Sequence, residues 1–154
     1  MINIGVCRSA LARPAVFFMV AILFPPGLFA TDDLLPSELQ ETLAAPITID
    51  AENLIELYQS VPGLTIIDSR LHEDHIQGYI ETSLNLPLPE TDCASLSKLA
   101  KSTEQAMVFY GNNNSGDVSI EAIQIASSCG YTRLFWFRGG FVEWKDKDYP
   151  YLIE

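Results

Sequence analysis

The chain has 154 residues, enough for one domain of ordinary size, and 48% of them are hydrophobic, which excludes a chain that is disordered throughout. Nine basic and twenty acidic side chains give it a formal charge of −11, so it offers no basic surface to nucleic acid or to anionic lipid. Its three cysteines are too few for a four-cysteine zinc site or a disulfide-rich scaffold.

Residues 1–30 have the pattern of a secretory signal peptide. Arg8 and Arg13 give a positive start, an apolar run follows, and small residues suit cleavage after Ala30. The alternative is an uncleaved membrane anchor, but the apolar run is shorter than the ~20 residues that a spanning helix needs. We therefore expect a periplasmic or secreted chain of 124 residues, with a charge of −13 and no stable membrane association.

The mature chain is predicted to contain an N-terminal arm, 31–45, with a short helix, and one domain, 46–154. Strands are predicted from apolar runs at 47–49, 64–67, 83–86, 106–110 and 134–137. Helices are predicted from helical spacing at 51–60, 71–77, 93–102 and 119–129, and a short last helix carries Trp144. The alternation predicts an α/β fold, a small parallel sheet with helices on both faces.

Ligands of parallel sheets bind beyond the carboxyl ends of the strands. The loop that follows the strand 106–110 is therefore the candidate site, and it consists of Gly111, Asn112, Asn113, Asn114, Ser115 and Gly116. Asparagine and glycine tolerate left-handed backbone, so one interpretation is a nest of N–H groups that binds a small anion. The favoured interpretation is a polar turn in which Ser115 or Asp117 caps the next helix, because the loop lacks lysine and arginine.

Three stretches, in this order, resemble the rhodanese-like family of sulfurtransferase domains. Residues 68–80 resemble its signature D-x-R…E-(Y/F)-x-x-G-H-I, residues 83–87 its A-x-N-x-P, and residues 130–150 its closing G-Y…G-G-x-x-x-W…P. The match covers about residues 47–150 and implies the fold of that family. It also implies structural roles for the motif residues, which are Asp68, Arg70, Gly78, Gly139, Gly140 and Trp144. The alternative role for Asp68 and Arg70 is that of a catalytic pair.

The resemblance implies a chemistry that this sequence lacks. In the family, the fourth strand ends in a cysteine that takes sulfur from a donor and passes the persulfide sulfur to a thiol or to cyanide. Here that position is Gly111, and Ser115 does not replace it because a hydroxyl forms no persulfide. We therefore expect no catalytic residue and no cofactor. The predicted function is a non-catalytic exported module that binds an unidentified protein or a small anion.

The alternative is a divergent sulfurtransferase that uses Cys93 or Cys129. Cys129 ends the helix after the loop, ~15 Å along its axis, which disfavours this alternative. Two cysteines in an oxidising compartment can also pair with each other, but nothing in their spacing shows that they do. His72 and His75 are three residues apart, as metal ligands on one helix face would be; we expect no metal and a partly buried His75, at a position where the family has an aromatic residue.

Overall fold

The computed structural model describes residues 45–113 and 118–154. The predicted signal peptide, nearly all of the arm, and Asn114, Ser115 and Gly116 of the candidate loop lie outside the described residues. The strands are β1 (Ile47–Ile49), β2 (Thr65–Asp68), β3 (Leu84–Asn85), β4 (Met107–Tyr110) and β5 (Leu134–Phe137). The helices are α1 (Ala51–Ser60), α2 (His72–His75), the 3-10 helix η2 (Leu88–Glu90), α3 (Cys93–Leu99), α4 (Val118–Ser128) and α5 (Gly140–Asp146).

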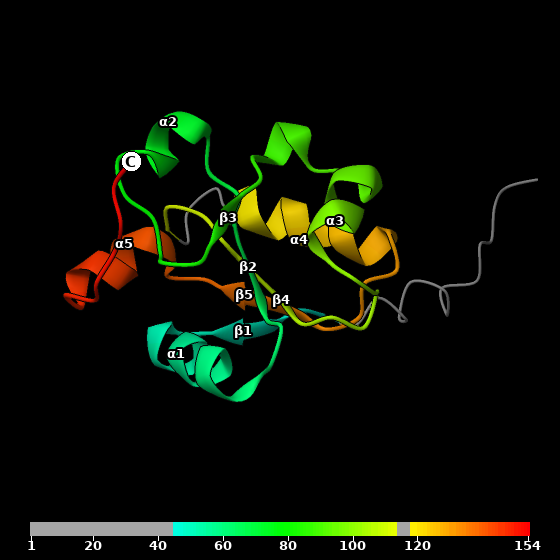
Figure 1. Ribbon diagram of the computed structural model, residues 1–154, viewed down its shortest axis with the longest axis horizontal. Coiled ribbons are helices and arrows are strands. Elements are labelled where there is room, and N and C mark those ends of the chain that lie inside the picture. The colour runs from blue at the N-terminus through cyan, green and yellow to red at the C-terminus, as the bar shows by residue number, and fades with distance from the viewer. Residues whose placement is uncertain (1–44, 114–117) are drawn as a thin grey trace, which may run out of the picture. The chain divides into compact units, whose positions relative to one another are not determined.

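The five strands form one parallel sheet in the order β1-β5-β4-β2-β3 (Figure 1). Every residue of β2 and β4 is buried, as expected of central strands covered on both faces. The predicted parallel sheet of an α/β fold is confirmed. No helix among the described residues is long and apolar enough to cross a membrane.

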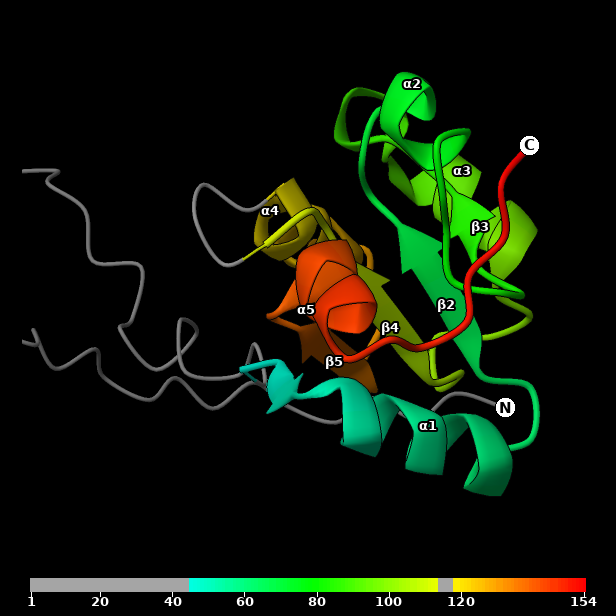
Figure 2. The same cartoon turned by 90° about the vertical axis from the view of Figure 1, so that its left-hand side faces the viewer.

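Each face of the sheet carries its own hydrophobic core. On one face, side chains of α1 and α5 pack on Ile66 and Val108. On the other face, side chains of α3 and α4 pack on Ile67 and Phe109. Neighbouring residues of β2 and β4 thus contribute to opposite cores, which is the alternation of a strand. Figures 1 and 2 show α1 on one side of the sheet and α3 and α4 on the other, so the prediction of helices on both faces is also confirmed.

Two helices are shorter than predicted. Helix α2 covers only 72–75, because the Gly78 N–H closes a tight turn on the His75 carbonyl at 2.9 Å. Helix α3 stops at Leu99, and the side-chain oxygen of Gln105 accepts the Lys101 N–H at 2.7 Å in the turn that follows. The sequence also did not predict η2, which lies among the prolines after β3.

Candidate functional site

The candidate site begins where β4 ends. Asp68 of β2 is paired with Tyr110 of β4, and the Ser69 N–H donates to the Tyr110 carbonyl at 2.9 Å, so Ser69 and Gly111 follow side by side. Gly111 is buried, and so is Ser69. The Ser69 Oγ has no hydrogen-bond partner among the described residues. The end of β4 therefore offers a glycine and a neighbouring buried hydroxyl, and no thiol.

The described part of the loop is bonded to the start of α5. The Phe141 N–H donates to the Gly111 carbonyl and the Val142 N–H to the Asn112 carbonyl, both at 2.9 Å. Gly140 has φ +61°, and a Cβ on it would lie 2.5 Å from the Gly111 oxygen. These first amides of α5 are thus occupied by the protein's own carbonyls. The anion nest predicted for the rest of the loop falls outside the described residues.

Gly139 and Trp144 belong to the same packing. A Cβ on Gly139 would collide with the side chain of Glu143, whose Oε1 accepts the Ala51 N–H at 3.1 Å. Trp144 is buried, and its Nε1–H donates to the Pro150 carbonyl at 2.9 Å. The two adjacent glycines and the tryptophan hold α5 against the loop and against α1.

Asp68 is the centre of a buried polar network behind this site. Its carboxylate accepts from Arg70 Nε at 2.8 Å and from the Tyr110 hydroxyl at 2.9 Å, and it contacts His75 Nδ1 at 2.9 Å. Arg70 also donates to the Gly78 carbonyl at 2.8 Å, which links the end of β2 to the turn after α2. All these polar groups have partners within the fold, so the arrangement is that of a structural network.

The pKa shifts in this network follow from burial and charge. Burial raises the pKa of Tyr110, and the negative charge of Asp68 raises it further. Burial opposes the charge of Arg70, but the hydrogen bonds and charge of Asp68 outweigh it and raise the pKa of the guanidinium. Arg70 therefore stays charged, and Tyr110 stays a neutral donor to Asp68.

The two histidines line the same hollow but have different surroundings. His75 is buried, its ring stacks on Tyr79 at 4.2 Å, and its Nδ1 faces Asp68. His72 is exposed, with its ring centre 6.5 Å from that of His75. Across 45–113 and 118–154, no third histidine, cysteine or acidic residue joins them in a metal-binding group.

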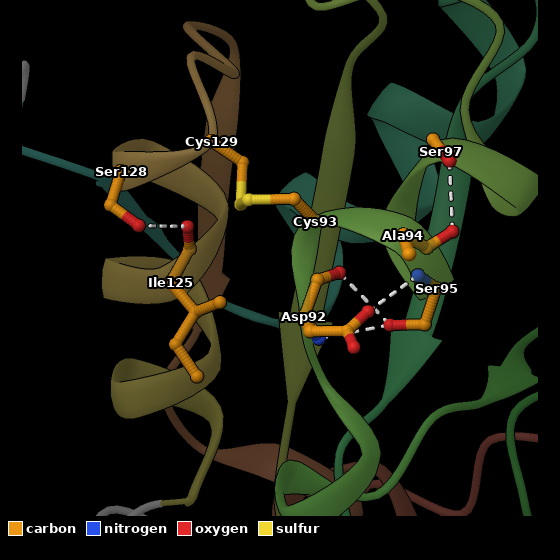
Figure 3. Close-up of a disulfide and its surroundings, with 8 residues drawn as sticks. All are labelled: Asp92, Cys93, Ala94, Ser95, Ser97, Ile125, Ser128 and Cys129. Carbon is orange, nitrogen blue, oxygen red and sulfur yellow. Dashed lines mark hydrogen bonds between the residues drawn. A yellow bond between two sulfur atoms is a disulfide. The ribbon is translucent and has the colours of Figure 1, made fainter.

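The two cysteines of the described chain form a disulfide, which answers the question that their spacing left open. Cys93 starts α3, Cys129 directly follows α4, and their Cα atoms are 5.5 Å apart (Figure 3). Next to the bond, Asp92 caps α3 by accepting the Ser95 N–H at 2.7 Å, which lowers the pKa of its carboxyl. The bond lies beyond the far end of α4 from the loop, and the 11 residues of α4 span about 16 Å.

Comparison with known proteins agrees with this geometry. The sequence model of the rhodanese-like domain matches residues 50–147. The chain belongs to the rhodanese-like domain family. A rhodanese domain-containing protein of Drosophila melanogaster is 32% identical in an alignment 97 residues long, which covers 56% of this chain and 86% of that protein.

Solved structures of rhodanese-like proteins share the fold. The rhodanese-like domain of an Anabaena protein superposes with a TM-score of 0.61 at 21% identity, over 71% of this chain and 81% of that domain. The thiosulfate sulfurtransferase of Pseudomonas aeruginosa gives 0.62 at 15% identity, over 76% of this chain and 21% of the enzyme. At these identities the superpositions establish the fold alone.

Three features of the site were not predicted from the sequence of this rhodanese-like domain. Tyr110 ends an apolar strand and was assigned to it without a polar role, and Ser69 was only a variable position between Asp68 and Arg70. The contact of Gly140 with the loop joins segments about thirty residues apart. The only sequence signal for it was the pair of adjacent glycines, which the family motif already contained.

Proposed function

We propose that this rhodanese-like domain has no sulfurtransferase activity and works as a binding or accessory module in the periplasm or outside the cell. The observation that carries the proposal is that the described chain has no free cysteine thiol. Cys93 and Cys129 are bonded to each other, and Gly111 stands at the end of β4. Cys7, the third cysteine of the sequence, lies in the segment predicted to be removed.

A sulfur carrier needs a thiolate held among groups that favour its negative charge. Neither sulfur of a disulfide is a thiolate, and this disulfide lies a helix length from the loop. The hydroxyl of Ser69 is buried beside Gly111, but a hydroxyl forms no persulfide. These facts argue against the divergent sulfurtransferase as well as against the ordinary family mechanism.

The described part of the loop, residues 111–113, also offers little to a small anion. The first amides of α5 are occupied by Gly111 and Asn112, and the Asn112 side chain donates to the Asp74 carboxylate at 3.4 Å. A carboxylate at this place repels an anion. We therefore favour a protein or an uncharged or cationic ligand over the small-anion alternative.

Two independent features support export. The first is the signal-like segment 1–30, and the second is the disulfide, because such bonds persist in oxidising compartments and are rare in the cytosol. The negative charge of the mature chain does not distinguish the periplasm from the extracellular space. We therefore propose both compartments.

The first step of sulfur transfer is formation of a persulfide on the protein, and this step tests whether the chain lacks the activity. The mature chain is incubated with thiosulfate and its intact mass is measured. We expect no added sulfur on the natural chain. In Gly111→Cys the new thiolate should attack the outer sulfur of thiosulfate and release sulfite, so that the chain gains one sulfur atom, which cyanide removes as thiocyanate. Gly111→Ser is the matched control, because it adds a similar side chain without a thiol. A cyanide-labile sulfur on the natural chain would overturn the proposal.

A further inference from the structure

An apolar cavity of about 110 Å³ lies on the α1 and α5 side of the sheet, away from the disulfide and on a different core from it. Helix α1, strand β2, the turn 80–83 and helix α5 enclose it. Its lining includes Leu54, Tyr58, Ile66, Ile80, Glu81 and Trp144. Its lining includes no residue of the loop after β4, and the inference drawn from it rests on the binding role proposed above.

The inner wall of the cavity is apolar and fixed. Leu54, Ile66 and Ile80 are at most 3% exposed. The indole of Trp144 is held by its hydrogen bond to the Pro150 carbonyl and by the ring of Tyr149 at 4.9 Å. Because the indole N–H is already bonded, the ring offers the cavity no free hydrogen-bond donor. This wall suits an apolar group and does not require a ligand with polar atoms at its inner end.

The mouth of the cavity has a different chemistry. Tyr58 is 55% exposed, and Glu81, which also lines the cavity, is exposed. Glu81 has no hydrogen bond or ion pair with any residue in the described part of the chain. An unpaired carboxylate and aromatic rings in the lining of one cavity are a combination that attracts an organic cation.

The turn that carries Glu81 is held in a conformation of high energy. The next residue, Thr82, has φ +70°, where a β-branched side chain is strained by about 1–3 kcal/mol and glycine would not be. The turn is fixed by the Ser83 N–H, which donates to the Ile80 carbonyl at 3.0 Å, and by the Ile80 N–H, which donates to the Tyr110 hydroxyl at 3.3 Å. Strain of this kind gathers at binding sites, where the surrounding structure imposes it.

We propose that this cavity binds a small organic cation, with an aryl or branched alkyl group against Trp144 and an ammonium group at the mouth beside Glu81 and Tyr58. The cavity of about 110 Å³ is smaller than the apolar cavity of about 150 Å³ that binds benzene, so the apolar group of the ligand enters in part and its charged end stays outside. A positive charge on the ligand also suits the protein, because the sequence has a net charge of −11, which attracts cations from solution.

Benzylamine, which is protonated at neutral pH, is the probe, with benzyl alcohol and benzoate as its neutral and anionic counterparts. Titrations of the isotope-labelled mature chain are followed by NMR at the Trp144 indole N–H and at the methyl groups of Leu54 and Ile80. We expect shifts at these groups, and binding of benzylamine about fivefold tighter than that of benzyl alcohol, as for a charge pair at an exposed site. Benzoate should bind most weakly.

Two variants distinguish the effect of the Glu81 charge on binding from an effect on folding. Glu81→Gln keeps the size of the side chain and should remove the preference for benzylamine over benzyl alcohol. Glu121→Gln is the matched control, because Glu121 is an exposed carboxylate on α4, on the opposite face of the sheet, and it should leave the preference unchanged. Both positions are exposed, so folding should not be affected.

Three results would overturn the proposal: no shift with benzylamine, shifts confined to other residues, or a preference for benzylamine that survives in Glu81→Gln. None of them bears on persulfide formation, so the failure of this proposal and that of the proposed function are read from different experiments.

Discussion

Gly140 is the point at which the loop after β4 and helix α5 meet, and its replacement by alanine tests that contact. Its φ of +61° is unfavourable for a side chain, and a Cβ there would lie 2.5 Å from the Gly111 oxygen and 2.8 Å from Asn112 backbone atoms. Real Cβ atoms do not approach backbone so closely. The loop and the start of α5 must therefore separate in Gly140→Ala.

The expected loss has two parts. The left-handed backbone costs alanine about 1–2 kcal/mol. Separation of the loop weakens the bonds from Phe141 N–H to Gly111 and from Val142 N–H to Asn112, each with a net contribution of about 0.5–1.5 kcal/mol. Together these give a decrease of about 2–5 kcal/mol in the free energy of unfolding.

Gly63→Ala is the matched control. Gly63 has φ +75°, and a Cβ there would have no heavy atom within 4 Å, so only the backbone cost of about 1–2 kcal/mol remains. Urea unfolding of both variants, followed by circular dichroism, should show that Gly140→Ala loses about 1–3 kcal/mol more than Gly63→Ala. Equal losses, or a larger loss in Gly63→Ala, would refute the reasoning.

Three further predictions concern the disulfide, the buried tyrosine and the signal segment. Replacement of Cys93 and Cys129 by serine should lower the free energy of unfolding by about 3–4 kcal/mol, since the bond closes a loop with a sequence separation of 36; an unchanged melting temperature would contradict this. Burial and the charge of Asp68 raise the pKa of Tyr110, so the stability that its neutral form contributes is complete below about pH 10 and is lost above it, by up to about 1.4 kcal/mol per pH unit. Tyr110→Phe should show a shallower alkaline loss than the natural chain in urea unfolding at several pH values, and identical slopes would count against the assigned pKa shift. The intact mass of exported protein should correspond to a start near Thr31, and a full-length, membrane-bound species would exclude the signal peptide.

The elements and the sheet were predictable because they depend on local patterns. Apolar runs marked β2 and β4, Asp50 marked the start of α1, and the left-handed glycines Gly63 and Gly130 lie just after α1 and α4. The alternation of strands and helices then left few arrangements other than a parallel sheet. The motif match added the family, and residues 50–147 confirm it.

The details of the site depend on tertiary packing and were not predictable. Pairing of Cys93 with Cys129 requires that the start of α3 meet the end of α4, which no local spacing encodes. The hydroxyl of Tyr110 has a role only because Asp68 lies beside it on the next strand. The cavity beside Trp144 likewise requires that α1, α5 and a turn converge.

A turnover assay of sulfur transfer is the most direct test of whether this rhodanese-like domain is inactive, as we propose. The mature chain is assayed for thiocyanate formation from thiosulfate and cyanide, alongside Cys93→Ser and Cys129→Ser. In the natural chain Gly111 provides no nucleophile and both cysteines are in a disulfide, so we predict no thiocyanate above the uncatalysed rate. Each serine variant frees one thiol, but that thiol lies a helix length from the loop, so we predict no thiocyanate from the variants either. Robust thiocyanate formation by the natural chain that disappears in one serine variant would contradict the account and establish that cysteine as the sulfur carrier.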